Sequence, residues 1–165
     1  MNRTLFTIGV YGTTEGSFFR SLVEHEVTHF VDIRRRRGMR GSQYAYANAS
    51  ALQRKLKELG IEYVHFLDLS PTKEIREAQK AVDAAVGTTK SARIELGSEF
   101  VRRYESECLS QFDAKEFLGR FPQNARLALF CVEKQPQACH RSLLAKRIES
   151  EAGVSWLDIT PGGSL

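Results

Sequence analysis

The sequence lacks any long hydrophobic run and shows no secretory signal layout. No apolar stretch approaches the roughly 20 residues that a membrane-spanning helix needs. The opening MNRTLFTIGV has only a short apolar stretch, which leads directly into YGTTEG, unlike a signal peptide. We therefore expect a cytoplasmic protein without a membrane partner.

Cysteine is also scarce, and internal repeats, low-complexity segments and convincing linkers are lacking. The three cysteines are Cys108, Cys131 and Cys139. An odd, small number without a secretory signal indicates reduced thiols rather than a disulfide framework. A length of 165 residues with 42% hydrophobic residues is typical of one globular domain and argues against disorder. We expect a single domain over residues 1–165.

Apolar periodicity predicts alternating strands and helices. The predicted strands cover residues 5–10, 29–33, 61–69, 126–132 and 154–159; the predicted helices cover 15–26, 49–60, 73–85, 97–111, a short segment capped by Asp113 and Glu116, and 140–152. This order predicts an α/β fold: a single-domain, mostly parallel open sheet with helices on both faces.

Ligands of open parallel sheets bind outside the carboxyl ends of the strands. Polar residues follow several predicted strand ends, and we expect Arg34, His65, Glu133 and Arg141 to converge on one cleft there. Core packing alone does not require this recurrence of polar residues.

The segment CVEKQPQACHR, residues 131–141, carries the most reactive chemistry. Cys139, His140 and Arg141 stand at a predicted helix start, where free N–H groups and the helix dipole lower the pKa of a cysteine. Cys139 is thus a candidate nucleophile, with Glu133 as general base or as a group that orients an arginine, and with His65 and His140 as further catalytic candidates. Arg141 is assigned to substrate binding. Purely structural roles for these residues remain open.

A metal site at Cys131, Cys139 and His140 is a further interpretation. The spacing lacks the paired C-x2-C of strong zinc motifs, and a fourth ligand would have to come from elsewhere, such as His65. Cys131 itself lies in an apolar run that is typical of a buried core residue. We therefore expect no metal and no other cofactor.

Positive charge is concentrated in one segment. RRRRGMR, residues 34–40, holds five arginines; without them the net charge falls from +4 to −1. Such a segment attracts phosphates, although a solvated loop that binds nothing is an equal alternative. Asp32, Arg34, Arg35 and Tyr44 are candidate substrate-binding residues, with the arginines holding phosphate and the tyrosine stacking on a base. A structural Asp32–Arg34 pair is the alternative for those two residues.

Four motifs together resemble the family called domain of unknown function 488. They are Thr7-Ile8-Gly9, Asp32-Ile33-Arg34, the segment GIEYVH at residues 60–65, and the segment at 131–141. The resemblance covers nearly the whole chain and implies a small α/β fold whose shared polar residues line one cleft. It implies no reaction. The chain departs from the family pattern at RRRRGMRG and at Leu69-Ser70-Pro71.

Three functions are compatible with these residues. The first is an enzyme that acts on nucleic acid or a nucleotide, with an arginine-rich cleft for phosphate. The second is a nucleic-acid-binding module without catalysis, and the third is a thiol enzyme for a small anionic substrate. Steep salt dependence distinguishes polyanion binding from the third.

Overall fold

The protein is built on one sheet of five parallel strands. The computed structural model describes residues 3–90 and 92–162. The strands are β1 (Thr4–Ile8), β2 (His29–Asp32), β3 (Glu62–His65), β4 (Arg126–Phe130) and β5 (Trp156–Ile159), in the spatial order β3-β2-β4-β1-β5. The predicted α/β fold with a parallel sheet is confirmed.

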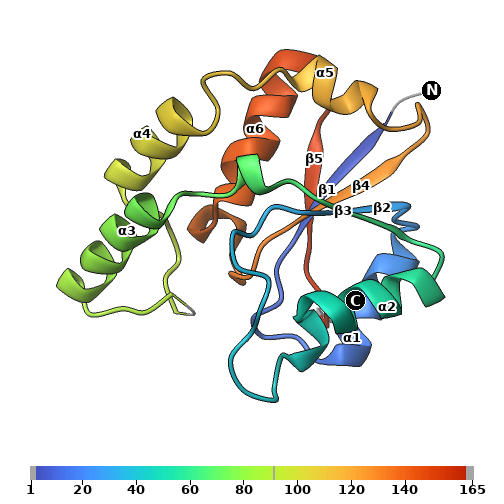
Figure 1. Cartoon of the computed structure of the whole chain (residues 1–165), viewed down its shortest axis with the longest axis horizontal. Helices are drawn as coiled ribbons and strands as arrows, with labels where there is room; N and C mark the ends of the chain where they lie inside the picture. Colours follow the sequence, from blue (N-terminus) through green and yellow to red (C-terminus); the bar gives the residue numbers. More distant parts are fainter. Residues whose placement is uncertain (1–2, 91, 163–165) are drawn as a thin grey trace.

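Helices cover both faces of the sheet, as Figure 1 shows. The helices α1 (Glu15–Glu24) and α2 (Ala49–Glu58) cover one face; α3 (Lys73–Ala85), α4 (Ser98–Glu107), α5 (Ala114–Gly119) and α6 (His140–Ala152) lie on the other. Two hydrophobic clusters correspond to these two layers. Because both faces are buried, the central strands are apolar at successive positions instead of alternating with polar residues.

Successive side chains of the central strands pack alternately into the two hydrophobic clusters. Phe30 and Phe130 pack towards α1 and α2, whereas Val31 and Leu129 pack towards α6 and its neighbours. This follows from the two-residue period of a strand, which points successive side chains to opposite faces. Each face of the sheet therefore contributes side chains to one of the two hydrophobic cores.

Residues at the ends of several helices cap them, and these residues can be recognised in the local sequence. Thr14 caps α1 by accepting a hydrogen bond from the Ser17 N–H, and Asp113 caps α5 in the predicted way by accepting from the Glu116 N–H. The helix α6 ends at Gly153, which adopts the left-handed φ of 69° that favours glycine. These caps satisfy backbone groups that have no partner inside the helix.

The third strand is shorter than the sequence predicts. β3 ends at His65, and Leu67–Leu69 form a turn of 3-10 helix instead of strand. β3 is an edge strand, so nothing pairs with it on its outer side to extend the ladder. Within the described part of the chain, no helix is long and apolar enough to cross a membrane.

The first core depends on Phe18 of α1, whose ring is fully buried and contacts the rings of Phe19, Phe30, Tyr46 and Phe130. We expect Phe18→Ala to lower the free energy of unfolding by about 3–5 kcal/mol, because it leaves a cavity among aromatic rings. Urea denaturation measures this change.

The matched control is Val23→Ala in the same helix, where the side chain is 51% exposed. It should change the free energy of unfolding by less than about 0.5 kcal/mol. Equal effects of the two substitutions would contradict the assignment of Phe18 to the core.

Candidate functional site

The loops after β1 and β4 lie against each other at the carboxyl edge of the sheet. The backbone N–H groups of Val10 and Tyr11 both donate to the carbonyl oxygen of Val132, at 3.1 and 2.9 Å. A Cβ atom on Gly9 would lie only 1.9 Å from the carbonyl oxygen of Glu133. Glycine is therefore required here for close approach. The chain leaves β1 towards one face of the sheet and leaves β4 towards the other. Open α/β sheets bind their ligands between two such neighbouring strands, at the carboxyl edge.

Beneath these loops, Cys131, Cys139 and His140 form a buried cluster. Cys131 follows β4, Cys139 is the N-cap residue of α6, and His140 begins that helix. The Nδ1 atom of His140 lies 3.6 Å from the Cys131 sulfur and 3.7 Å from the Cys139 sulfur. Its Nε2 atom lies 2.8 Å from the carbonyl oxygen of Ile33, which can only accept. Nε2 therefore carries the proton, and Nδ1 presents a lone pair to the two thiols.

Cys139 occupies the predicted helix start, but its environment does not make it a thiolate. The side chain is wholly buried, and this burial raises the pKa of the Cys139 thiol to about 11. The neighbouring Cys131 raises this pKa further, whereas His140 lowers it. Burial therefore acts on the pKa of Cys139 in the direction opposite to the effect expected from the helix end.

Glu133 is held by two cations that lie between α3 and α4. Arg93 donates to Oε1 of Glu133 at 2.8 Å, and the Lys90 Nζ atom lies 3.8 Å from the same oxygen. Burial raises the pKa of Glu133, an effect that Lys90 and Arg93 oppose. The other oxygen, Oε2, accepts from the Cys131 thiol at 3.3 Å. Glu133 thus links the cysteine cluster to the α3–α4 connection.

Sequence reasoning missed Arg93, which fixes this connection. Besides Glu133, its guanidinium donates to Asp83 and to the carbonyl oxygen of Ala138, both at 3.0 Å. No sequence signal pointed to it, because TTKSAR does not follow a strand and resembles an ordinary solvated loop. Only the return of the chain from α3 brings it to the sheet edge.

Arg141 supports the loop after β4 from below and has no exposed surface. Its Nη1 atom donates to the Glu133 carbonyl oxygen at 2.6 Å, and its Nη2 atom donates to the Lys134 carbonyl oxygen at 3.1 Å. Nη2 also lies 3.3 Å from Asp158 of β5, which accepts a further hydrogen bond from Thr7 of β1. The position of Arg141 is that of a support for the loop rather than of a group open to substrate.

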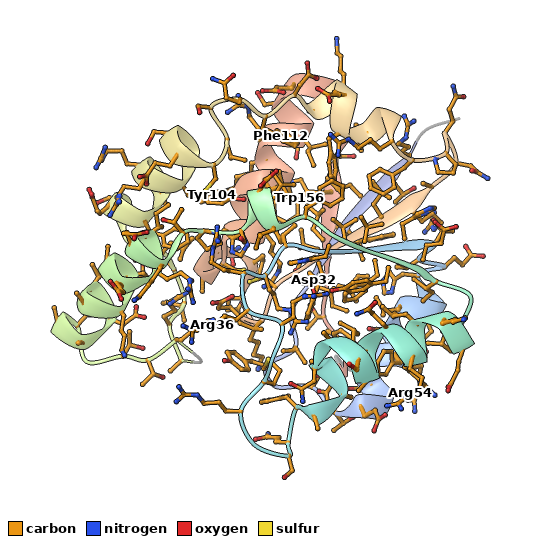
Figure 2. All side chains as sticks on the ribbon, in the orientation of Figure 1. Asp32, Arg36, Arg54, Tyr104, Phe112 and Trp156 are labelled. Atoms are coloured by element: carbon orange, nitrogen blue, oxygen red, sulfur yellow. The ribbon has the colours of Figure 1, made fainter. Side chains whose placement is uncertain are left out.

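Asp32 and Arg34 form a buried bidentate ion pair. Arg34 donates from Nε and Nη2 to the two carboxylate oxygens, at 3.0 and 2.9 Å. The Tyr63 hydroxyl donates to Asp32 at 2.7 Å, and Arg34 also binds the carbonyl oxygen of Ala47. Figure 2 places Asp32 near the centre of the molecule. Of the two interpretations in the sequence, the geometry favours the structural pair over direct substrate contact.

His65 lies apart from the cysteine cluster. Its Nε2 atom donates to the carbonyl oxygen of Arg34 at 2.7 Å. The cavity beside it, of about 400 Å³, is lined by Val64–Asp68, Arg120 and Phe121. Arg34, Glu133 and Arg141 are buried, and their expected convergence with His65 on one cleft stays a prediction.

The rim of the site carries the arginine run and two tyrosines. Tyr44 accepts a hydrogen bond from the Gly12 N–H at 2.9 Å, and its ring packs against that of Tyr11. Arg35 donates to the carbonyl oxygen of Pro71, and Arg36 is exposed on the α3 side of the loop after β2 (Figure 2). The loops after β1 and β2 therefore meet over the edge that holds the cysteines.

Comparison with known proteins identifies a family but no characterised relative. The family described as domain of unknown function DUF488 has a model that matches residues 16–148. No curated protein and no solved structure matches. The matched range includes the cysteine cluster, Glu133, the arginine run and Arg141.

The contact at Gly9 gives a test of how the two loops are held. We expect Gly9→Ala to lower the free energy of unfolding by about 1–3 kcal/mol, because the added methyl group forces the loops after β1 and β4 apart. Gly16→Ala is the control, since a Cβ atom there meets nothing within 4 Å. Thermal and urea unfolding of the two variants measure the difference, and a Gly9→Ala protein as stable as the wild type would contradict the close contact.

Proposed function

The chain belongs to this family of unknown function, and we propose from its site that it is an enzyme that acts on nucleic acid or a nucleotide. In this proposal a group of arginines at the rim binds phosphate. The reaction takes place at the edge of the sheet beside Glu133, Cys139 and His140. The observation that carries the proposal is the meeting of Arg35, Arg36 and Arg76, which form no ion pair among the described residues.

The phosphate-binding part rests on Arg35, Arg36 and Arg76. Burial lowers the pKa of Arg76 most, and Arg36 and Arg35 lie close enough to lower it further, whereas Glu77 and Glu74 raise it. Among the described residues none of the three forms an ion pair, whereas Arg34 is neutralised by Asp32. The Nε atom of Arg76 is buried and has no hydrogen-bond partner among the described residues. An anion would relieve both the repulsion and the missing hydrogen bond.

Arg76 adds to this group a residue that lies outside the arginine run. It belongs to α3, which packs beside α4, and reaches the loop after β2 from a different element. Arginines that meet from separate elements can hold a phosphate from two sides, and their forked guanidinium groups suit its oxygens. A solvated loop would not need this second element.

The reactive part rests on the cluster at the start of α6. Glu133 is the candidate general base, because its Oε2 atom is turned towards the thiols while Arg93 and Lys90 hold its Oε1 atom. Tyr11 and Tyr44 at the rim offer rings on which a base can stack. We place this activity in the cytoplasm, where the three free cysteines would stay reduced.

The two alternatives are less well supported. A thiol enzyme needs an accessible thiolate, whereas Cys139 is fully buried with a pKa raised to about 11. A binding module without catalysis needs only the arginines and tyrosines and leaves the buried polar cluster without a purpose. Binding that persists while the cluster is altered would not by itself separate this module from an enzyme, so turnover has to be measured as well.

The arginine group can be tested by titration. We expect replacement of Arg35, Arg36 and Arg76 by glutamine to weaken binding of labelled single- and double-stranded oligonucleotides. It should also flatten the dependence of log K on log salt by at most about 2.7, for three lost phosphate contacts at a slope of about −0.9 each. Fluorescence titration at several salt concentrations measures both quantities.

The control removes the same charge from another surface by replacing Arg20, Arg54 and Lys57, exposed residues of α1 and α2, with glutamine. Figure 2 shows Arg54 on a part of the molecule distant from Arg36. If both triple variants weaken oligonucleotide binding equally, the loss of binding reflects the lower net charge and not a specific arginine site. If the wild type fails to bind at low salt, the proposal is wrong.

A further inference from the structure

The buried cluster at the start of α6 has the donor atoms of a metal site. Two thiols and one imidazole nitrogen, from Cys131, Cys139 and His140, all lie within 4.8 Å of one another. We propose that these three residues bind one zinc ion through their two Sγ atoms and Nδ1, and that the two thiol protons are released to solvent on binding. The spacing in the sequence argued against such a site, but β4 and α6 bring the separated cysteines together.

The two sulfur–nitrogen distances within the cluster match those around zinc. With Zn–S near 2.3 Å and Zn–N near 2.0–2.1 Å, tetrahedral geometry separates a sulfur from a nitrogen by about 3.6 Å. The observed separations from Nδ1 are 3.6 Å to Cys131 and 3.7 Å to Cys139. An ion would therefore fit among the three atoms with little movement of the backbone.

His140 is oriented as a metal ligand would be. A ligating histidine almost always donates its other ring N–H to a carbonyl or carboxylate, which fixes the ring and the tautomer. Here Nε2 donates to the carbonyl oxygen of Ile33 at 2.8 Å, so Nδ1 faces the thiols without a proton. Ile33 follows β2, so the orientation of His140 is set by the sheet itself.

The fourth position belongs to a water molecule rather than to a side chain. Among the described residues, the mutually close set contains these three and no carboxylate. His65, the fourth ligand considered from the sequence, instead donates to the carbonyl oxygen of Arg34. Three protein ligands and an open position are the arrangement of catalytic zinc sites, whereas structural sites hold four protein ligands.

Glu133 lies beside the proposed ligands. Its Oε2 atom lies 3.3 Å from the Cys131 sulfur, and its other oxygen is held by Arg93. Zinc held by these residues would supply a polarised and more acidic water molecule. No oxidant or reductant is involved. Thiolate and imidazole donors in a tetrahedral set favour zinc over calcium or magnesium.

The test is metal content together with cobalt spectroscopy. Wild-type protein purified with added zinc and then dialysed should retain close to one zinc ion per chain by elemental mass spectrometry. Replacement of zinc by cobalt should produce the charge-transfer absorption of a thiolate–cobalt bond. Cys131→Ser, Cys139→Ser and His140→Asn should each lose most of the bound metal. Circular dichroism checks that each variant is folded.

The matched control is Cys108→Ser. Cys108 is half-buried, lies outside the cluster and donates to the Ser70 carbonyl oxygen at 3.5 Å. This variant should keep its zinc and its cobalt spectrum. Bound zinc should also protect Cys131 and Cys139 of the wild type from alkylation, a readout that does not depend on any variant folding.

Several results would overturn the inference. They are wild-type protein without stoichiometric zinc after loading, a cobalt spectrum without thiolate absorption, equal loss of zinc in Cys108→Ser, or a Cys131–Cys139 disulfide in freshly prepared protein. The zinc site does not depend on the proposed function: the variant at Arg35, Arg36 and Arg76 should retain its metal. Failure of oligonucleotide binding and failure of zinc binding are thus separate results.

Discussion

The close approach of two loops at the carboxyl edge of the sheet positions the rest of the site. It is possible because Gly9 has no side chain where the Glu133 carbonyl oxygen lies. It is held from below by Arg141, whose guanidinium binds the carbonyl oxygens of Glu133 and Lys134 and reaches Asp158 of β5. A buried cation surrounded by carbonyl and carboxylate oxygens is costly to disturb, because removing a partner leaves charge without compensation.

The hydrogen bonds from Arg141 fix the position of the loop after β4, and this position determines which side chains Glu133 and Cys131 meet. With the loop after β4 fixed, Glu133 meets Arg93 from the α3–α4 connection, and Cys131 meets the start of α6. Glu133 and Cys131 thus each have polar partners in the interior, which makes their burial tolerable. The proposed zinc ion would complete the same set of contacts by taking the lone pair that His140 directs at the two thiols.

The arginine run divides into two parts with different surroundings. Arg34 is neutralised by Asp32 inside the fold, whereas Arg35 and Arg36 face Arg76 across a loop. The charge of Arg34 is compensated by the carboxylate of Asp32 beside it. In the second part Arg36 and Arg35 lower the pKa of Arg76 after the larger lowering by burial, whereas Glu77 and Glu74 raise it. The surroundings of this part are therefore set by a helix that lies far away in the sequence.

The sequence by itself determined the order of strands and helices, the parallel sheet and the edge at which polar residues gather, because apolar periodicity and caps act over a few neighbouring residues. It predicted α3 and α6 with their observed bounds, since Thr72 and Gly153 mark local ends. Only the tertiary structure decided that Cys139 is a buried thiol and that Arg93 contacts Glu133. Those outcomes depend on desolvation and on contacts between distant segments, which no local pattern records.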